Sequence, residues 1–183
     1  AENAGTVTTG NDGWITGNII LDRDIWGPGD FGDWGVSLGN GRLAFGVNNG
    51  TSGQTIVGTT NVADGQWHHV AVTRRASDGL LTIFVDGRID AEGSGPVGNL
   101  SYRDGRATSY PADSFLVLGA EKHDAGSGYP SYSGWLDELR ISTSVRYTQR
   151  FAAPVEPLGT DAATVGLYRF DEGVGTVVRD SSG

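Results

Sequence analysis

The sequence predicts an all-β protein built as a two-sheet antiparallel β-sandwich. Thirty glycines and six prolines punctuate the 183 residues, and five Asp-Gly and two Asn-Gly pairs mark tight turns along the chain. Between these turns lie short apolar runs rich in β-branched and aromatic residues, which is the composition of strands. No segment shows a sustained apolar period of 3.6 residues, so helices are not expected.

The strongest strand signal is a hairpin formed by residues 67–74 and 80–85, with an Asp-Gly pair at each outer end. Residues 80–85 carry apolar side chains on both faces, interrupted only by Thr82. A strand of this kind needs cover on both sides, so we expect it in the middle of a sheet. Trp67 and Trp135 open strands, and we expect both in the core.

Further strands are expected along most of the chain. They cover residues 14–21, 35–38, 43–47, 55–59, 115–119, 135–141 and 164–170, with an edge strand at 6–9. Asn40-Gly41 is the expected turn between the second and third of these. Residues 92–114 are polar and carry no strong strand signal.

Two motifs resemble the laminin-G-like, concanavalin A-like jelly-roll domains. The first is Asp-Gly-x-Trp-His-His-Val-Ala-Val at residues 64–72, followed by Leu-x-Ile-x-Val-Asp-Gly at 81–87. The second is Gly-Trp-Leu-Asp-Glu-Leu-Arg-Ile-Ser at residues 134–142. Residues 146–154 and 167–171 resemble the tail of bacterial and phage members, whereas residues 1–60 are only loosely similar. The resemblance implies a concanavalin A-like jelly roll.

We expect residues 1–183 to form one jelly-roll domain with a shifted start. Residues 167–183 resemble the segment that usually opens such domains, and residues 1–13 are too poor in apolar groups to supply it. The segment 165–183 would then provide the usual opening strand. The alternative is that the chain runs into a neighbouring module of a larger parent protein, and neighbouring domains are expected partners.

The charge of the chain argues against several classes of partner. The net charge is -9, from 22 acidic and 13 basic residues, and Lys122 is the only lysine. Such a surface repels phosphate backbones, so nucleic-acid binding is not expected. With no cysteine and no run of about 18 apolar residues, neither disulfides nor membrane insertion is expected. Extracellular or cell-surface localisation suits this composition, although plain solvated acidity explains it too.

An acidic and aromatic segment, residues 22–34, is the candidate ligand-binding site. Aromatic rings stack on sugar faces, and carboxylates bind sugar hydroxyls, so the segment and a later tyrosine-rich loop suit a carbohydrate. The candidate residues are Asp22, Asp24, Trp26, Asp30, Asp33, Trp34, Tyr129 and Tyr132. The alternative is that these loop aromatics only cover an open edge of the sandwich.

Asp137 is the candidate centre of a metal site. The period of two places it on the same strand face as Trp135 and Leu139, and a carboxylate there needs a cation, an arginine or backbone amides as partner. The resemblance implies a structural Ca²⁺ near this aspartate and near the Asp-Ser-Ser-Gly turn at residues 180–183. The candidate ligands are Asp137, Glu172, Asp180 and Ser182. Of the histidines, His68 and His69 suit packing, and His123 suits a surface contact.

No motif indicates catalysis, so an enzyme is not expected. Some relatives with this fold hydrolyse glycans with carboxylates spaced as Glu-x-Asp-x-x-Glu, which is absent here, and nucleophile-elbow and phosphate-loop motifs are absent too. The preferred function is a non-catalytic carbohydrate-binding or adhesion module of an exported bacterial protein, stabilised by Ca²⁺, with a carbohydrate or cell-surface glycan as partner. The alternatives are a structural or protein-interaction module without sugar binding, and a glycan hydrolase or lyase.

Overall fold

A computed structural model describes residues 5–25, 31–100 and 115–183. The strands in these residues are β1 (Asn18–Arg23), β2 (Phe31–Gly39), β3 (Arg42–Asn49), β4 (Gly53–Val57), β5 (Val70–Arg74), β6 (Leu80–Val85), β7 (Arg88–Ser94), β8 (Val117–Leu118), β9 (Leu139–Ser142) and β10 (Thr164–Tyr168). The described residues contain no helix. The all-β prediction is therefore confirmed.

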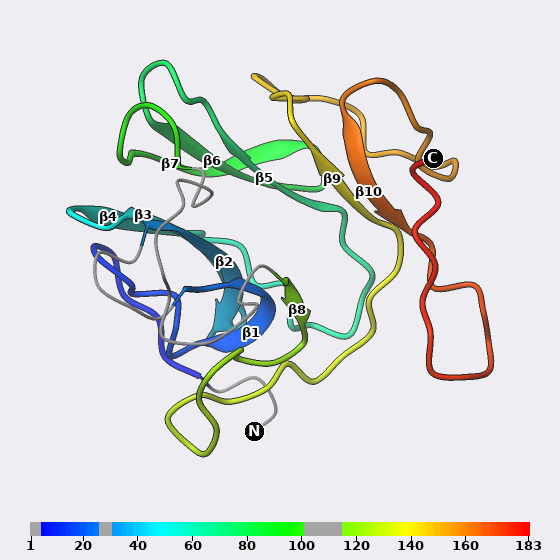
Figure 1. Cartoon of the computed structure of the whole chain (residues 1–183), viewed down its shortest axis with the longest axis horizontal. Coiled ribbons are helices and arrows are strands. Elements are labelled where there is room, and N and C mark those ends of the chain that lie inside the picture. Colours follow the sequence, from blue (N-terminus) through cyan, green and yellow to red (C-terminus); the bar gives the residue numbers. More distant parts are fainter. Residues whose placement is uncertain (1–4, 26–30, 101–114) are drawn as a thin grey trace.

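The strands form two stacked layers (Figure 1). One layer is a five-stranded antiparallel sheet in the order β4-β3-β2-β1-β8. The other is divided into a three-stranded sheet, β5-β6-β7, and a two-stranded sheet, β10-β9. This arrangement is the antiparallel sandwich that the sequence predicts.

The core lies between the layers and draws on both of them. Its buried side chains are Val36, Leu38, Leu43, Phe45, Val47 and Ile56 from the five-stranded sheet, and Leu81, Ile83 and Val85 from β6. β6 is the middle strand of its sheet, and all but its first residue are buried. The apolar run at residues 80–85 was therefore read correctly as an interior strand.

Two hairpins close through residues in the left-handed region. Asn40 and Gly41 have φ values of 50° and 77°, and Asp86 and Gly87 have φ values of 50° and 75°. Two consecutive positive φ values define the type I′ turn, whose twist matches that of the strands it joins. The Asn-Gly prediction is confirmed. The second hairpin leads into β7, a strand that the sequence analysis does not predict.

The outer face of the five-stranded sheet carries a small second core. Trp14 is only 1% exposed and clusters there with Ile19 and Ala44. Its indole ring occupies the space left by two glycines: a Cβ atom on Gly35 would lie 2.0 Å from the ring, and one on Gly46 would lie 1.9 Å from it. The predicted strand at 14–21 thus begins only at Asn18, because Trp14 belongs to a turn that folds over the sheet.

Three other expectations from the sequence are wrong. Trp67 and Trp135 are 69% and 84% exposed instead of buried. β9 begins at Leu139, so Asp137 lies in the preceding loop and is exposed. The strand expected at 115–119 has only two residues, and Phe115 is exposed. All three expectations extended an alternating pattern beyond the residues that actually pair.

The C-terminal segment pairs with the late strand of the domain. β10 pairs antiparallel with β9, and the tail beyond it lies outside the two layers (Figure 1). The Asp180 carboxylate accepts the N–H groups of Leu167 and Ser182, at 3.0 and 2.9 Å, which ties the tail to β10. That one domain with a shifted start spans residues 1–183 remains a prediction.

His68, just before β5, makes pH-dependent hydrogen bonds that link the β5–β6 hairpin to the segment before it. Its Nδ1 lies 2.8 Å from Asp86 and its Nε2 lies 3.1 Å from Asp64. The bond to Asp86, and to a lesser degree that to Asp64, raises the pKa of His68 above 6.5. The resulting stability is complete below pH 6.5 and is lost as the pH rises through the raised pKa.

When the pH is raised from 6 to 9, His68 loses its proton and its bonds to Asp86 and Asp64 weaken. We expect the unfolding free energy of the wild type to fall by up to about 1 kcal/mol for this reason. The variant His68→Gln should lack that part of the loss. Urea unfolding at the two pH values measures it. An equal loss in both proteins would show that other groups produce the pH dependence.

Candidate metal centre

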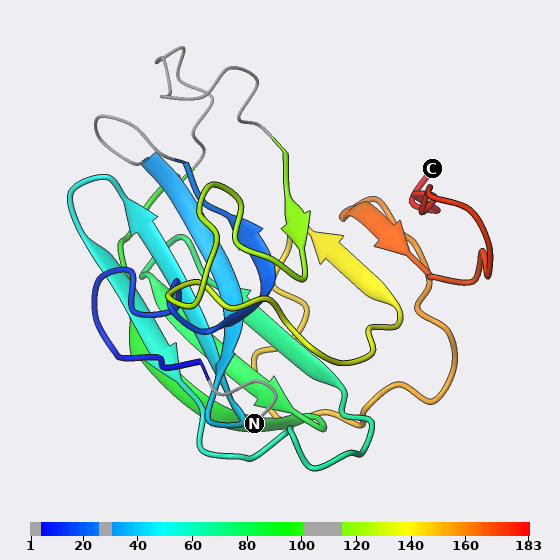
Figure 2. The same ribbon diagram turned by 90° about the horizontal axis from the view of Figure 1, so that it is seen from below.

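A cluster of acidic side chains forms where the end of β1 meets the segment that follows β8. The two strands pair antiparallel, with Leu21 opposite Leu118 and Asp22 opposite Val117. Beyond β8 the chain turns back beside β1, where Gly119 donates its N–H to the Ile20 carbonyl at 3.0 Å (Figure 2). Residues about 100 positions apart in the sequence are thereby brought together. We call Asp22, Asp24, Glu121 and His123 the acidic cluster.

Asp22 is the most deeply buried member and has no exposed surface. Its Oδ1 accepts the N–H of Asp24 at 2.6 Å, and its Oδ2 accepts the N–H of Lys122 at 2.8 Å. Burial, reinforced by the charges of Asp24 and Glu121, raises the pKa of Asp22 to about 7. Burial and the neighbouring carboxylates thus disfavour the ionised form of Asp22.

Asp24, Glu121 and His123 supply the donor atoms. One atom from each lies within 4.8 Å of the other two, and this is the only such group of His, Asp and Glu side chains among the described residues. His123 Nδ1 lies 3.1 Å from Asp24 Oδ2. Because both side chains are largely buried, the arrangement is fixed by the fold. His123 is thus not the surface residue expected from the sequence.

Glu121 carries the feature that points to a ligand. Its Oε2 accepts the N–H groups of His123, at 2.7 Å, and of Asp124. Its Oε1 is buried and has no hydrogen-bond partner, in a residue that is only 8% exposed. Burial raises the pKa of the Glu121 carboxyl. An unsatisfied buried carboxylate oxygen is costly unless a cation or a proton occupies the site.

Lys122 provides part of the compensating charge. Its Nζ donates to the backbone carbonyl of Asp24 at 2.8 Å and lies 4.5 Å from the centre of the Phe115 ring. The ammonium group is thus bonded to the backbone beside the carboxylates.

Of the predicted ligand residues, the structure brings three aspartates together near the end of β1. Asp22, Asp24 and Asp33 are buried, and Asp33 accepts the N–H of Ile25 at 3.0 Å. Trp34 is part of β2 and packs against the main core, as does Tyr132. Tyr129 lies half-buried in the segment after β8. Trp26 and Asp30 lie outside the described residues.

The metal ligands predicted near the C-terminus do not form a comparable group. Asp137 is exposed, so the argument that placed it on an apolar face does not hold. The carboxylate of Glu172 accepts the N–H of Arg179 at 2.8 Å, and Asp180 and Ser182 form the turn described above. A metal role for these four residues remains a prediction.

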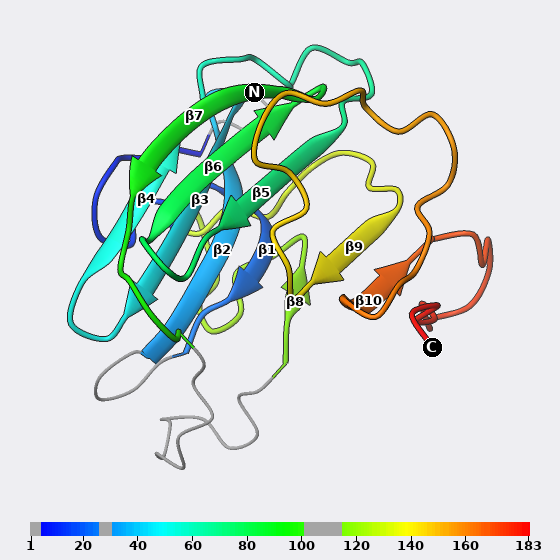
Figure 3. The ribbon, with the colours of Figure 1, turned by 90° about the horizontal axis from the view of Figure 1, so that it is seen from above.

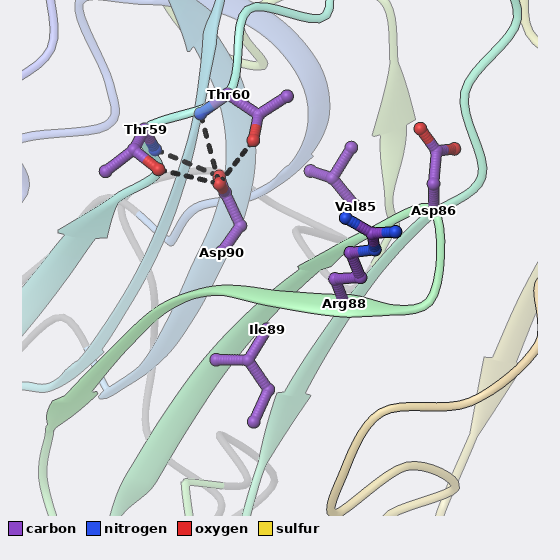
Figure 4. Close-up of a pocket in the computed structure, with 7 residues that line it drawn as sticks. All are labelled: Thr59, Thr60, Val85, Asp86, Arg88, Ile89 and Asp90. Carbon is purple, nitrogen blue, oxygen red and sulfur yellow. Dashed lines mark hydrogen bonds between the residues drawn. The ribbon is translucent and has the colours of Figure 1, made fainter.

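A separate hollow lies at the end of the β6–β7 hairpin (Figure 4). It has a volume of about 520 Å³ and is lined by Thr59, Thr60, Val85, Asp86, Arg88, Ile89 and Asp90. One of its two carboxylates, that of Asp90, accepts hydrogen bonds from the N–H and hydroxyl groups of both threonines, at 2.6–3.0 Å. Those four bonds hold the β4–β5 connection against β7, which is a structural role.

The sequence profile described as the concanavalin A-like lectin/glucanases superfamily matches residues 8–150, well over half of the chain. The chain belongs to this superfamily. The match confirms the resemblance seen in residues 64–87 and 134–142, and it agrees with the antiparallel sandwich.

Curated relatives cover part of the chain. "Sushi, von Willebrand factor type A, EGF and pentraxin domain-containing protein 1" of Rattus norvegicus is 32% identical over 91 residues, which are 48% of this chain and 2% of that protein. "Pentraxin-4" of Homo sapiens is 33% identical over 76 residues, which are 42% of this chain and 14% of that protein. The chain therefore spans only a small part of these relatives. No solved structure matches significantly.

The fold and the matched profile place the chain in the concanavalin A-like superfamily, and part of the chain is similar to two proteins whose names include pentraxin. In the part of the chain that the structure describes, no helix is long and apolar enough to cross a membrane.

Proposed function

We propose that this chain is a non-catalytic binding module that holds Ca²⁺ in the acidic cluster and uses this site to bind a glycan outside the cell. The observation that carries the proposal is the buried Oε1 atom of Glu121, which has no partner and belongs to a cluster with Asp24 and His123. A hard divalent cation would satisfy this oxygen and would offset the charge of three neighbouring carboxylates.

The donor set favours Ca²⁺ over softer metals. Carboxylate oxygens predominate in the cluster, the chain has no cysteine, and Ca²⁺ prefers oxygen ligands. Because His123 Nδ1 contacts Asp24 Oδ2, we assign the histidine the role of orienting the Asp24 carboxylate, which would bind the metal. Binding of Zn²⁺ through this nitrogen is the competing outcome. Extracellular Ca²⁺ is high enough to fill even weak sites of modular proteins.

The metal proposal is tested by thermal unfolding in Ca²⁺ and in chelator. If Ca²⁺ is present at about a hundredfold excess over its Kd, the folded state gains about 2.7 kcal/mol, so the melting temperature should fall clearly in chelator. Glu121→Gln should remove most of that difference, because it neutralises the unpartnered carboxylate. Glu156→Gln is the control, because it makes the same chemical change at an exposed glutamate that belongs to neither the acidic cluster nor the predicted C-terminal metal site.

Equal melting temperatures in Ca²⁺ and chelator would contradict the Ca²⁺ proposal, and stabilisation by Zn²⁺ alone would replace Ca²⁺ by Zn²⁺. Direct titration of the metal by calorimetry separates binding from indirect effects of salt on stability.

The glycan proposal is tested separately. A cation held by the acidic cluster can also coordinate sugar hydroxyls, and Tyr129 lies half-buried in the same segment as Glu121. Retention on a glycan array should depend on Ca²⁺, and Glu121→Gln should abolish it. Ca²⁺ binding without any glycan retention would leave a structural or protein-interaction module as the function.

Hydrolysis is the second candidate, because two carboxylates within reach of each other are also the hallmark of glycosidases. In the acidic cluster, however, Glu121 and Asp24 are almost fully buried, and one oxygen of Glu121 accepts two backbone N–H groups. Carboxyl groups bound in this way are not free to act as the acid and the base of a glycosidase. Release of reducing sugar from common polysaccharides, lost in Glu121→Gln, would establish an enzyme instead.

A further inference from the structure

The second layer of the sandwich is interrupted between β5 and β9. β5 is an end strand of the three-stranded sheet, and β9 is an end strand of the two-stranded sheet, so no described strand pairs with either edge. The two strands lie side by side and run in the same direction (Figure 3). A strand placed between them would be antiparallel to both, as all other paired strands of the protein are.

The backbone of β5 presents free hydrogen-bonding groups on this edge. Asp86 donates its N–H to the His69 carbonyl, and Arg75 donates its N–H to the Leu80 carbonyl. These contacts mark the hydrogen-bonded pairs with β6, which alternate along an antiparallel ladder. The N–H and C=O groups of the residues between them, Val70 and Val72, therefore point to the open edge.

β9 also has unpaired backbone N–H and C=O groups on its edge toward β5. Leu167, which lies opposite Arg140, uses its own N–H and C=O toward Asp180 and Ser181 on its far side. Arg140 and Leu167 thus form a non-hydrogen-bonded pair, and the backbone groups of Arg140 point away from β10. The two open edges face each other with unpaired donors and acceptors.

The core is also less covered along the edge of β5 that faces β9. Val70 lies opposite Val85 on the core face of the sheet, yet Val70 is 41% exposed, whereas Val85 is 5% exposed. The exposed Trp67 precedes β5. Apolar side chains and free backbone groups along one edge require an extended polypeptide, because sugars do not pair with such a ladder.

The other edge of this sheet is built differently. β7 carries charged residues at alternate positions, Arg88, Asp90 and Glu92, which is how natural sheets protect a true edge. The sequence Val-Ala-Val-Thr-Arg of β5 has no such protection until its last residue.

We propose that the edges of β5 and β9 bind one extended polypeptide strand, antiparallel to both, with apolar side chains at alternate positions, supplied by a segment other than these 183 residues. Insertion joins the two parts of the layer into one sheet and covers Val70. A second copy of the chain is a poor donor, since its described strands are already paired. Its tail is interrupted by Gly173 and Gly175, which have φ values of 66° and 97°.

Hydrogen exchange with a peptide probe tests the proposal. The probe is a blocked peptide of alternating threonine and valine with a lysine at each end, and the control probe has the same sequence with N-methylated valines. In the free protein the amides of Val70, Val72 and Arg140 should exchange quickly, while those of Ala71 and Thr73 are protected. The probe should protect all three fast amides together, and the control probe should not.

A pair of proline variants locates the site. Val72→Pro removes an N–H on the open edge without breaking a bond to β6, and it should weaken probe binding about tenfold. Glu92→Pro makes the matching change on the outer edge of β7 and should leave binding unchanged. The melting temperatures of both variants show whether each one folds.

Four outcomes would overturn the proposal. They are absence of probe binding, protection confined to β5, protection on β4 or β7 instead, and protection of Val70, Val72 and Arg140 in the free protein. In the last case light scattering would distinguish a dimer, in which a second copy occupies the edges, from a monomer that closes the gap itself. None of these outcomes bears on the acidic cluster.

Discussion

Replacing Trp14 by alanine is expected to destabilise the protein by about 3–5 kcal/mol, which is the usual loss for a large buried aromatic side chain. Trp14 is 1% exposed and lies against the positions of Gly35 and Gly46, where no side chain can fill the space it leaves. Its backbone carbonyl also accepts the Ser37 hydroxyl at 2.6 Å, which fixes the turn over the sheet. Urea unfolding measures the loss.

The matched control is Trp135→Ala. This tryptophan is 84% exposed, so the same chemical change should alter the unfolding free energy by no more than about 0.5 kcal/mol. Comparable losses in the two variants would mean that Trp135 is covered in solution. The description of Trp14 as the centre of the second core would be wrong if Trp14→Ala were neutral.

The contrast between these tryptophans shows how far the sequence predicts the fold. Local patterns identified β6 and the Asn40-Gly41 turn, because alternation and turn chemistry are encoded within a few residues. They failed for Trp135, because its position depends on where β9 begins to pair with β10. β7 was missed since its charged residues, such as Asp90 and Glu92, hide the alternation expected of a strand.

The candidate site was predictable only in part for a similar reason. Asp22 and Asp24 were singled out by the density of aspartates between residues 22 and 33. Their partners, Glu121 and His123, lie about 100 positions later, and only the pairing of β1 with β8 brings them near. The available signal was an acidic residue directly after an apolar strand, followed by His-Asp. Because a single sequence shows no contacts, it did not decide between a site and a solvated loop.

Asp22→Asn should stabilise the metal-free protein, unlike most substitutions of buried polar residues. Burial raises the pKa of Asp22 to about 7, so the folded state resists its ionisation, whereas the unfolded chain ionises near 3.8. The stability that this group contributes is complete below pH 3.8 and is lost as the pH rises through 7. Each pKa unit corresponds to about 1.4 kcal/mol. The ionised carboxylate therefore costs several kcal/mol at pH 8.

In chelator at pH 8, Asp22→Asn is expected to unfold with about 3 kcal/mol more free energy than the wild type, because asparagine removes the buried charge and gives up about one hydrogen bond worth roughly 1 kcal/mol. The difference in unfolding free energy between the variant and the wild type should vanish near pH 4, because the folded wild type then carries a protonated Asp22. The control Asp180→Asn should behave in the opposite way, since the N–H groups of Leu167 and Ser182 lower the pKa of Asp180 and its carboxylate stabilises the turn at neutral pH.

With excess Ca²⁺ at pH 8 the advantage of Asp22→Asn should shrink, because the variant has one carboxylate fewer to attract the cation. Urea unfolding in chelator and in Ca²⁺, at pH 4 and pH 8, gives all four comparisons. A destabilised Asp22→Asn at pH 8 in chelator would show that the bonds from Asp24 and Lys122 outweigh the burial of the charge. The charges of Asp24 and Glu121 would then not destabilise the folded state through Asp22, and only Glu121 would carry a carboxylate oxygen that needs a cation.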